Sequence, residues 1–294
     1  MTRSESGTAQ GEGRTVTVRT QKVRKDHARQ RLYLFAGLAA ALLLVVIFAQ
    51  QLCPYNPNAQ IFDTLQPPSL AHPAGTDRYG RDLFSRVLVG LQTSVQYTLL
   101  LVLIITAAGT LLGVLAGYLG GVVDTLIMRI SDVCLAFPGL VFAMAIAALL
   151  NGGLMNAVIA LAVVSWPKYA RIARSSTLAL KNTDFIAAAK LAGDKPRQII
   201  LRHILPNSIG TILVTSMLDI GTMMMELAGL SYLGLGAQPP TAELGNMMSS
   251  GRSMLQTYPW VILAPGLAIF IAVVIFNLLG DAVRDYLDPR NKGN

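Results

Sequence analysis

Charged residues are scarce in this chain of 294 residues. Asp, Glu, Lys and Arg make up only 14% of it, whereas hydrophobic residues make up 53%. An ordinary soluble domain is about 25% charged, so this chain has too few charges to cover the surface of a soluble globule. Its two cysteines, Cys53 and Cys134, lie in or beside apolar stretches and provide no disulfide framework. The composition therefore predicts an all-α integral membrane protein.

The sequence also lacks the motifs of nucleotide, metal and hydrolytic chemistry. It contains no G-x-x-x-x-G-K-[ST] phosphate loop, no convincing dinucleotide fingerprint, no H-E-x-x-H and no C-x-x-C. Its three histidines, His27, His72 and His203, lie far apart, so we expect no metal site and no cofactor bound by this chain. An intramembrane enzyme is the least favoured alternative. If the protein moves a solute actively, the energy must come from an ion gradient or from another subunit.

Several uncharged stretches are long enough to cross a bilayer, which takes about 20 mostly apolar residues. We predict six transmembrane helices, with Asn151-Gly152-Gly153 dividing the stretch 133–167 between two of them. The six helices are expected at residues 32–52, 95–119, 133–150, 154–170, 208–230 and 258–280. Residues 231–257 are rich in Gly, Pro and Ser, so we expect a partly re-entrant or surface loop there.

The basic residues predict the orientation. Six spans place both termini on one side of the membrane, together with all of the 24 Lys and Arg except Arg78, Arg81, Arg86 and Arg252. The positive-inside rule makes that side cytoplasmic. The basic tail 1–31 would then lie against anionic membrane lipid, and the net charge of +8 requires no nucleic acid to explain it.

Three regions follow from this topology. Residues 1–31 form the basic cytoplasmic tail, 32–94 the first transmembrane helix and an external loop, and 95–290 a core of five transmembrane helices with a cytoplasmic loop at 168–207. The proline-rich external segment 54–90 fits either a solvated cap or a contact surface for another protein.

Glycines recur every four residues in the second predicted span, at Gly109, Gly113, Gly117 and Gly121. This spacing places them along one face of a helix, where small residues let another backbone approach closely. We expect a helix-packing seam there, formed either within the chain or as a moving or intersubunit contact.

Two acids, Asp219 and Glu226, lie inside the fifth predicted span. They are seven residues apart, which places them within about 20° on one helix face. Charges within a bilayer usually face a pathway or a partner. We assign Asp219, Glu226 and the adaptable Met223 to a translocation pathway. The alternatives are a structural pair or cap, and an ordinary interfacial position.

The loop 168–207 is patterned like two short helices. Asp184 is placed to cap the first helix and Gly193 to end it, while Pro196 opens the second and Pro206 would end it. Two short basic helices that project from a membrane domain fit a docking site for another protein. They fit an amphipathic helix lying on lipid headgroups equally well.

Four stretches resemble parts of bacterial ABC-importer permeases. Ala188-Ala189, Gly193 and Leu205-Pro206 are similar to the cytoplasmic EAA loop, although Ala187 stands where that family commonly has Glu. The other stretches resemble peptide and nickel permeases, and the matches extend from about residue 54 to 290. They are GTDRYGRDLFSR at 75–86, SYLGLG at 231–236 followed by PPT at 239–241, and NLLGDAVRDYLDP at 277–289.

The resemblance implies the permease subunit of an ATP-driven, binding-protein-dependent importer for small peptides or for nickel, free or chelated. It implies the type I ABC importer permease fold in a bacterial inner membrane. The expected partners are a second related permease, two ABC ATPases that carry ATP and Mg²⁺, and an extracytoplasmic solute-binding protein. The residues expected to couple to the ATPase are Asp184, Ala187, Ala188, Ala189, Gly193, Leu205 and Pro206.

A different class of transporter is the runner-up. A gradient-driven secondary carrier or channel would use Asp219 and Glu226 as relay groups, and its transport would follow membrane potential or pH rather than ATP. Inverted repeats with paired broken helices, which are common in such carriers, are not evident in the sequence.

Overall fold

A computed structural model describes residues 10–287 of the chain, and its side chains from residue 29 onward. The described part is helical and contains no strand, only an isolated bridge between Thr76 and Asp82. The helices are α1 Gln10–Ile47, α2 Ala49–Leu52, α3 Leu83–Leu119, α4 Gly121–Leu135, α5 Gly139–Leu149, α6 Leu154–Lys181, α7 Asp184–Leu191, α8 Pro196–Ile199, α9 Leu205–Tyr232, α10 Leu244–Gly251 and α11 Trp260–Leu287. A π-helical turn joins α8 to α9, and a 3-10 turn follows α10.

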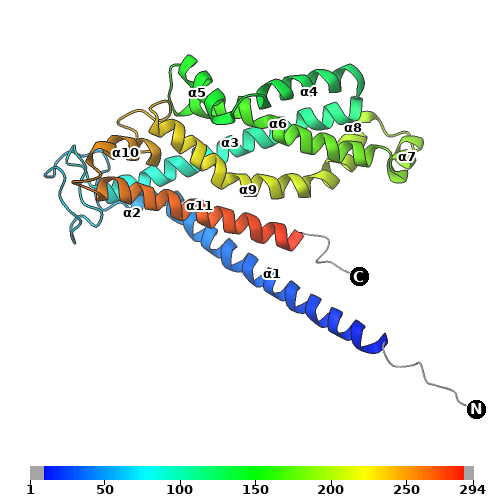
Figure 1. Cartoon of the computed structure of the whole chain (residues 1–294), viewed down its shortest axis with the longest axis horizontal. Coiled ribbons are helices and arrows are strands. Elements are labelled where there is room, and N and C mark those ends of the chain that lie inside the picture. Colours follow the sequence, from blue (N-terminus) through cyan, green and yellow to red (C-terminus); the bar gives the residue numbers. More distant parts are fainter. Residues whose placement is uncertain (1–9, 288–294) are drawn as a thin grey trace, which may run out of the picture.

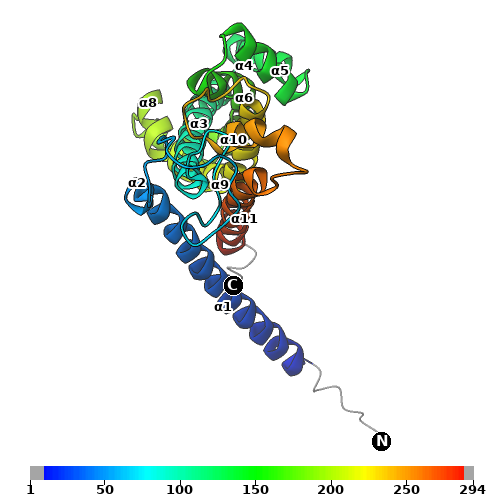
Figure 2. The ribbon, with the colours of Figure 1, turned by 90° about the vertical axis from the view of Figure 1, so that its left-hand side faces the viewer.

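The helices form an elongated bundle (Figure 1). α3, α6 and α9 run side by side through its centre, with α4 and α5 on one flank and α1 and α11 on the other (Figure 2). α10 and the irregular segment 53–82 lie at one end of the bundle, and α7 and α8 lie at the opposite end. The two ends therefore form two separate surfaces.

Four helical segments are long and apolar enough to cross a membrane, or five if the bent pair α4 and α5 forms one span. The four are Arg29–Ile47, α3, Pro196–Tyr232 and α11. The fourth predicted span, within α6, is not among them, because the second half of α6 carries several basic residues. The all-α membrane architecture is confirmed, and the count of six spans stays a prediction.

The second predicted span begins earlier than expected. α3 starts at Leu83 instead of 95, because Asp82 caps it by accepting a hydrogen bond from the Ser85 backbone N–H at 2.8 Å. The first turns of α3 contain polar residues, so the search for a long apolar stretch did not include them in the predicted span. The boundary that we placed between residues 94 and 95 therefore lies inside a continuous helix.

The third predicted span is not one straight helix. Residues 133–150 fall on the end of α4 and on α5, which meet at an angle of 93°. The break contains Pro138, which follows Phe137 and precedes Gly139. Proline lacks a backbone N–H and restricts the residue before it, so the helix stops there.

Pro206 does not end a helix, contrary to the prediction. It lies in the first turn of α9, within a helical segment that continues from Pro196 to Tyr232. The π-helical turn Ile200–Ile204 directly precedes it. A π-turn widens the helix locally, which makes room for the proline ring without breaking the segment.

Candidate functional site

Three of the four predicted glycines form a close helix contact. A Cβ added at Gly109, Gly113 or Gly117 of α3 would lie within 3 Å of α6 atoms. The contacted residues include Ala170 and Thr177. The seam therefore packs α3 against α6 within the chain, as small residues do in membranes.

Gly121 does not belong to this seam. The helix breaks at Gly120, and Gly121 begins α4 with φ +54° and no atom within 4 Å of an added Cβ. Two successive glycines with positive φ turn the chain away from the α3–α6 contact. The four-residue spacing continues in the sequence, but the helix that carries it ends at Leu119.

The predicted coupling residues lie at one end of the bundle (Figure 1). α7 begins at Asp184, whereas its N-cap is Thr183, one residue earlier than predicted. Gly193 follows the helix with φ +90°, as expected of a left-handed stop.

α7 has one buried face and one exposed face. Ile186 and Ala189 are buried, and they hold the helix against the rest of the chain. The opposite face is exposed, and the residue Leu191 is 91% accessible. This face consists of Asp184, Ala187, Ala188 and Leu191, at the spacing of one helix stripe. It is an exposed, mostly apolar surface at the end of the bundle.

The segment after α7 is tied both to the turn and to the core. His203 Nε2 lies 3.1 Å from Asp194 Oδ2, so an ion pair or hydrogen bond joins the π-turn to the residue after Gly193. Ile199 and Ile204 are buried in the same hydrophobic core as Ile186. Leu205 and Pro206 continue directly into α9. α7 is therefore connected to α9 through packed side chains and through the continuous helical segment Pro196–Tyr232.

Asp219 of α9 is buried and pairs with a lysine that the sequence analysis did not single out. Lys168 Nζ donates to Asp219 Oδ1 at 2.6 Å and to Oδ2 at 2.8 Å. Tyr169 Oη donates to Asp219 Oδ2 at 2.9 Å. Lys168 was visible as a lone cation inside the predicted fourth span, which was the available signal.

The two other predicted pathway residues differ in their surroundings. Met223 is buried in the chain's own hydrophobic core, so its side chain packs between helices and does not reach an exposed face here. Glu226 is half-buried on the face of α9 that carries Asp219. A pathway role for Asp219 and Glu226 stays a prediction.

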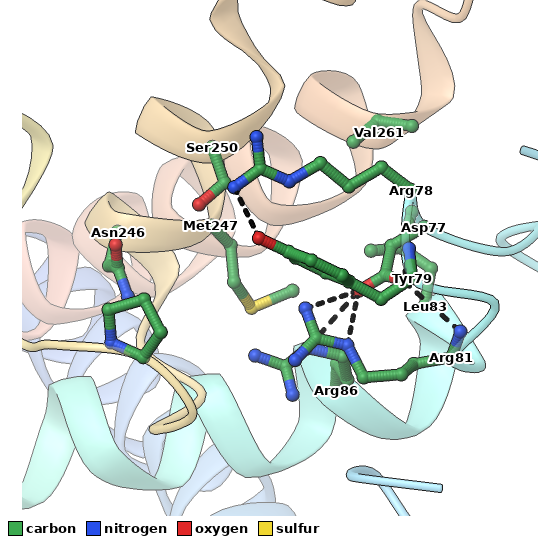
Figure 3. A pocket seen from close by; sticks show the side chains of 11 residues that line it. Asp77, Arg78, Tyr79, Arg81, Leu83, Arg86, Asn246, Met247, Ser250 and Val261 are labelled. Carbon is green, nitrogen blue, oxygen red and sulfur yellow. Dashed lines mark hydrogen bonds and ion pairs between the residues drawn. The ribbon is translucent and has the colours of Figure 1, made fainter. Parts of the chain in front are cut away.

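The segment 53–82 and the first turn of α3 are folded around buried charges (Figure 3). Asp77 Oδ2 lies 2.6 Å from Arg81 Nη2 and 3.7 Å from Arg86 Nε, and all three residues are buried. The Tyr79 ring contacts two guanidinium groups. The Cζ atom of Arg81 lies 4.5 Å from the ring centroid, and the Cζ atom of the exposed Arg78 lies 4.7 Å from it. A small pocket of about 30 Å³ lies between these residues and α10.

Asp82 pairs with His72 and Ser85 and not with Arg86, which lies four residues further along the chain. Its Oδ1 lies 2.9 Å from His72 Nδ1, and its Oδ2 is occupied by Ser85 at the start of α3. Arg86 instead donates to the Pro57 carbonyl oxygen and to Asn58 Oδ1. Burial raises the pKa of the nearby Cys53 thiol. The segment is thus a structured cap on α3.

Comparison with known proteins places the chain in a family. Residues 109–293 match the family model "Binding-protein-dependent transport system inner membrane component". The chain is 45% identical over 267 residues to the glutathione transport system permease protein GsiD of Pectobacterium atrosepticum, covering 90% of this chain and 89% of that protein. It is 48% identical to GsiD of Escherichia coli O6:K15:H31 over 268 residues, covering 90% and 88%.

A solved structure shows the same fold. The inward-facing MetNI methionine ABC transporter matches with a TM-score of 0.55 and 19% sequence identity, over 67% of this chain and 94% of that chain. The type I importer permease fold is thereby confirmed. The relatives are permeases rather than enzymes, and ATP hydrolysis takes place on a separate subunit. The family does not support the gradient-driven carrier. The chain belongs to the binding-protein-dependent transport system inner membrane components, the permease subunits of ABC importers.

Proposed function

We propose that this permease lines one half of the pathway of a peptide importer and moves that pathway when α7 is moved by an ATPase. The observation that carries the proposal is the exposed stripe of α7. This stripe lies at the end of the bundle, next to a helical segment that continues from Pro196 to Tyr232. A ligand shifts a conformational equilibrium only through contacts that differ between the states. An ATPase that holds α7 in both states and changes its own shape would supply them.

The coupling role rests on the residues that the family resemblance pointed to. Ala187, Ala188 and Asp184 lie on the exposed stripe, whereas Ala189 is buried beneath it. Gly193 turns the chain, and Leu205 and Pro206 form the start of α9. Since Ala187 replaces a carboxylate common in the family, we propose that the ATPase contact here is mainly apolar, with Leu191 as its largest side chain.

Peptides are the proposed substrate class, in preference to nickel. The relatives at 45–48% identity are glutathione permeases, and glutathione is a short peptide with free carboxylates. The external cap, residues 53–82, and the pocket beside α10 form the surface that we propose for the binding protein.

The proposed assembly contains a second related permease, two ATPases and an extracytoplasmic binding protein. This chain would bind no cofactor, and ATP and Mg²⁺ would be bound by the ATPases. We place both termini in the bacterial cytoplasm and count α6 as a further span, which brings the total to six. α6 suits this role because three of its basic residues have acidic partners on other helices: Lys168 with Asp219, Arg171 with Asp132 and Arg174 with Asp124. Pairing reduces the cost of charge in a bilayer.

The test is ATP-driven uptake of labelled glutathione by the complete transporter in liposomes. Deleting 184–193, or making Gly193→Asp, is expected to abolish uptake while the permease still inserts and assembles with its sister permease. Uptake that survives the deletion would disprove the coupling role. Uptake that does not depend on ATP and instead follows a pH gradient or the membrane potential would support the gradient-driven carrier.

A further inference from the structure

α9 carries a polar stripe along one face of a largely apolar helix. The stripe has spacings of four, four, three and four residues, which keep it on one helix face. It consists of Thr211, Thr215, Asp219, Thr222 and Glu226. Thr211 and Thr222 are exposed, and Thr215 and Glu226 are half-buried. Polar groups at membrane depth face a water-filled cavity or a protein partner rather than lipid.

Lys168 extends this stripe from α6. Its side chain is 52% exposed, whereas the side chain of its partner Asp219 is only 9% exposed. An ammonium group has three N–H donors, and Asp219 accepts two of them. The third donor remains for a ligand on the open side. Asp219, itself held by Tyr169, positions the ammonium group.

Glu226 supplies the opposite charge. Among the residues that the structure describes, its carboxylate makes no hydrogen bond or ion pair. It lies seven residues beyond Asp219, which is about 10 Å along the helix axis on the same face. A half-buried carboxylate and a half-exposed ammonium therefore lie at the two ends of a short polar path.

This separation matches a small zwitterion. An extended chain spans about 3.3–3.6 Å per residue, so three residues extend over about 10 Å and two over only about 7 Å. We propose that Lys168 binds the carboxylate end and Glu226 the ammonium end of a tripeptide in the translocation pathway. The inference rests on the proposed peptide importer and assigns the substrate contacts within it.

The test is competition for labelled Ala-Ala-Ala on the detergent-solubilised complex of both permeases and both ATPases, without binding protein. Unlabelled Ala-Ala-Ala, its C-terminal amide and its N-acetyl derivative are the competitors. In the wild type, each derivative is expected to compete about tenfold more weakly, because a charged hydrogen bond is lost.

The variants should separate the two ends. The double variant Lys168→Gln/Asp219→Asn, which leaves no buried unpaired carboxylate, should lose discrimination against the amide and keep it against the N-acetyl peptide. Glu226→Gln should do the reverse. Arg171→Gln is the matched control, since Arg171 is a half-exposed α6 cation paired with Asp132 at 2.7 Å, and its pattern should equal the wild type.

Two results would overturn the inference. One is the same competitor ranking in all folded variants, and the other is no saturable binding by a complex that still imports peptide with ATP. The proposed function fails separately: the wild-type complex would then show no ATP-driven uptake of either glutathione or Ala-Ala-Ala.

Discussion

Lys168 Nζ lies 2.6 Å from Asp219 Oδ1, which joins α6 to α9 near the middle of both helices. The pair is asymmetric, because Asp219 is buried and Lys168 is half-exposed. Removing the lysine therefore leaves a buried carboxylate without its cation, whereas removing the carboxylate leaves an ammonium group that still reaches the exposed side. Burial makes the first defect the more costly one.

We expect Lys168→Gln to lower the melting temperature of the purified permease more than Asp219→Asn does. The double variant should recover part of the loss, because it leaves no unpaired buried charge. Thermal unfolding of the four proteins in one detergent measures this cycle. Additive losses in the double variant would show that the two side chains do not depend on each other.

The α3–α6 seam should reject any side chain at Gly113. A Cβ there would overlap the backbone of Ala170, which cannot move aside as a flexible side chain would. Gly113→Ala is expected to destabilise the protein by about 1–3 kcal/mol, the usual cost of overpacking. Gly210→Ala is the control, since its added Cβ meets nothing within 4 Å. Unchanged thermal stability of Gly113→Ala would contradict the close approach.

The exposed stripe of α7 should matter for coupling and not for folding. Leu191→Glu is expected to reduce ATP-driven uptake by about tenfold or more, which corresponds to losing about 1.4 kcal/mol of ATPase contact. Its melting temperature should stay unchanged, because Leu191 is almost fully exposed. Leu119→Glu is the matched control, an exposed leucine at the end of α3 that lies outside both proposed docking surfaces. Equal uptake by both variants would remove Leu191 from the ATPase contact.

Sequence patterns predicted the features that depend on local chemistry. The glycine spacing predicted the packing face of α3 at Gly109, Gly113 and Gly117 but not the helix that packs on it, and Gly193 was correctly placed as a helix stop. The patterns failed where a neighbouring element decides the outcome. Gly121 continues the four-residue spacing beyond the end of α3. Pro206 is accommodated by a preceding π-turn that no residue type predicts.

The sequence could not predict the pairing of Lys168 with Asp219 for another reason. The two residues are 51 positions apart, and periodicity within one helix cannot show which residue of another helix will face it. The same holds for Met223, whose burial depends on how α9 packs against its neighbours. A lone lysine inside an apolar stretch was the available warning, since charges at membrane depth are rarely unpaired.

The external cap depends on Asp77. This one carboxylate faces both Arg81 and Arg86, and all three residues are buried. Replacing it by alanine would leave two buried guanidinium groups without this counter-charge, and breaking a buried pair in this way costs about 3–5 kcal/mol. We therefore expect Asp77→Ala to open the segment 53–82 while the helical bundle remains folded.

Limited proteolysis from the external side measures this opening, with cleavage between residues 54 and 82 expected at lower protease concentration than in the wild type. Asp63→Ala is the control, because Asp63 is an exposed carboxylate of the same segment whose side chain, within the part of the chain that the structure describes, accepts only from Gln66 at 3.0 Å. If both variants resist cleavage as the wild type does, the buried charges do not hold the cap on α3, and its aromatic contacts among Tyr55, Phe62 and His72 are sufficient.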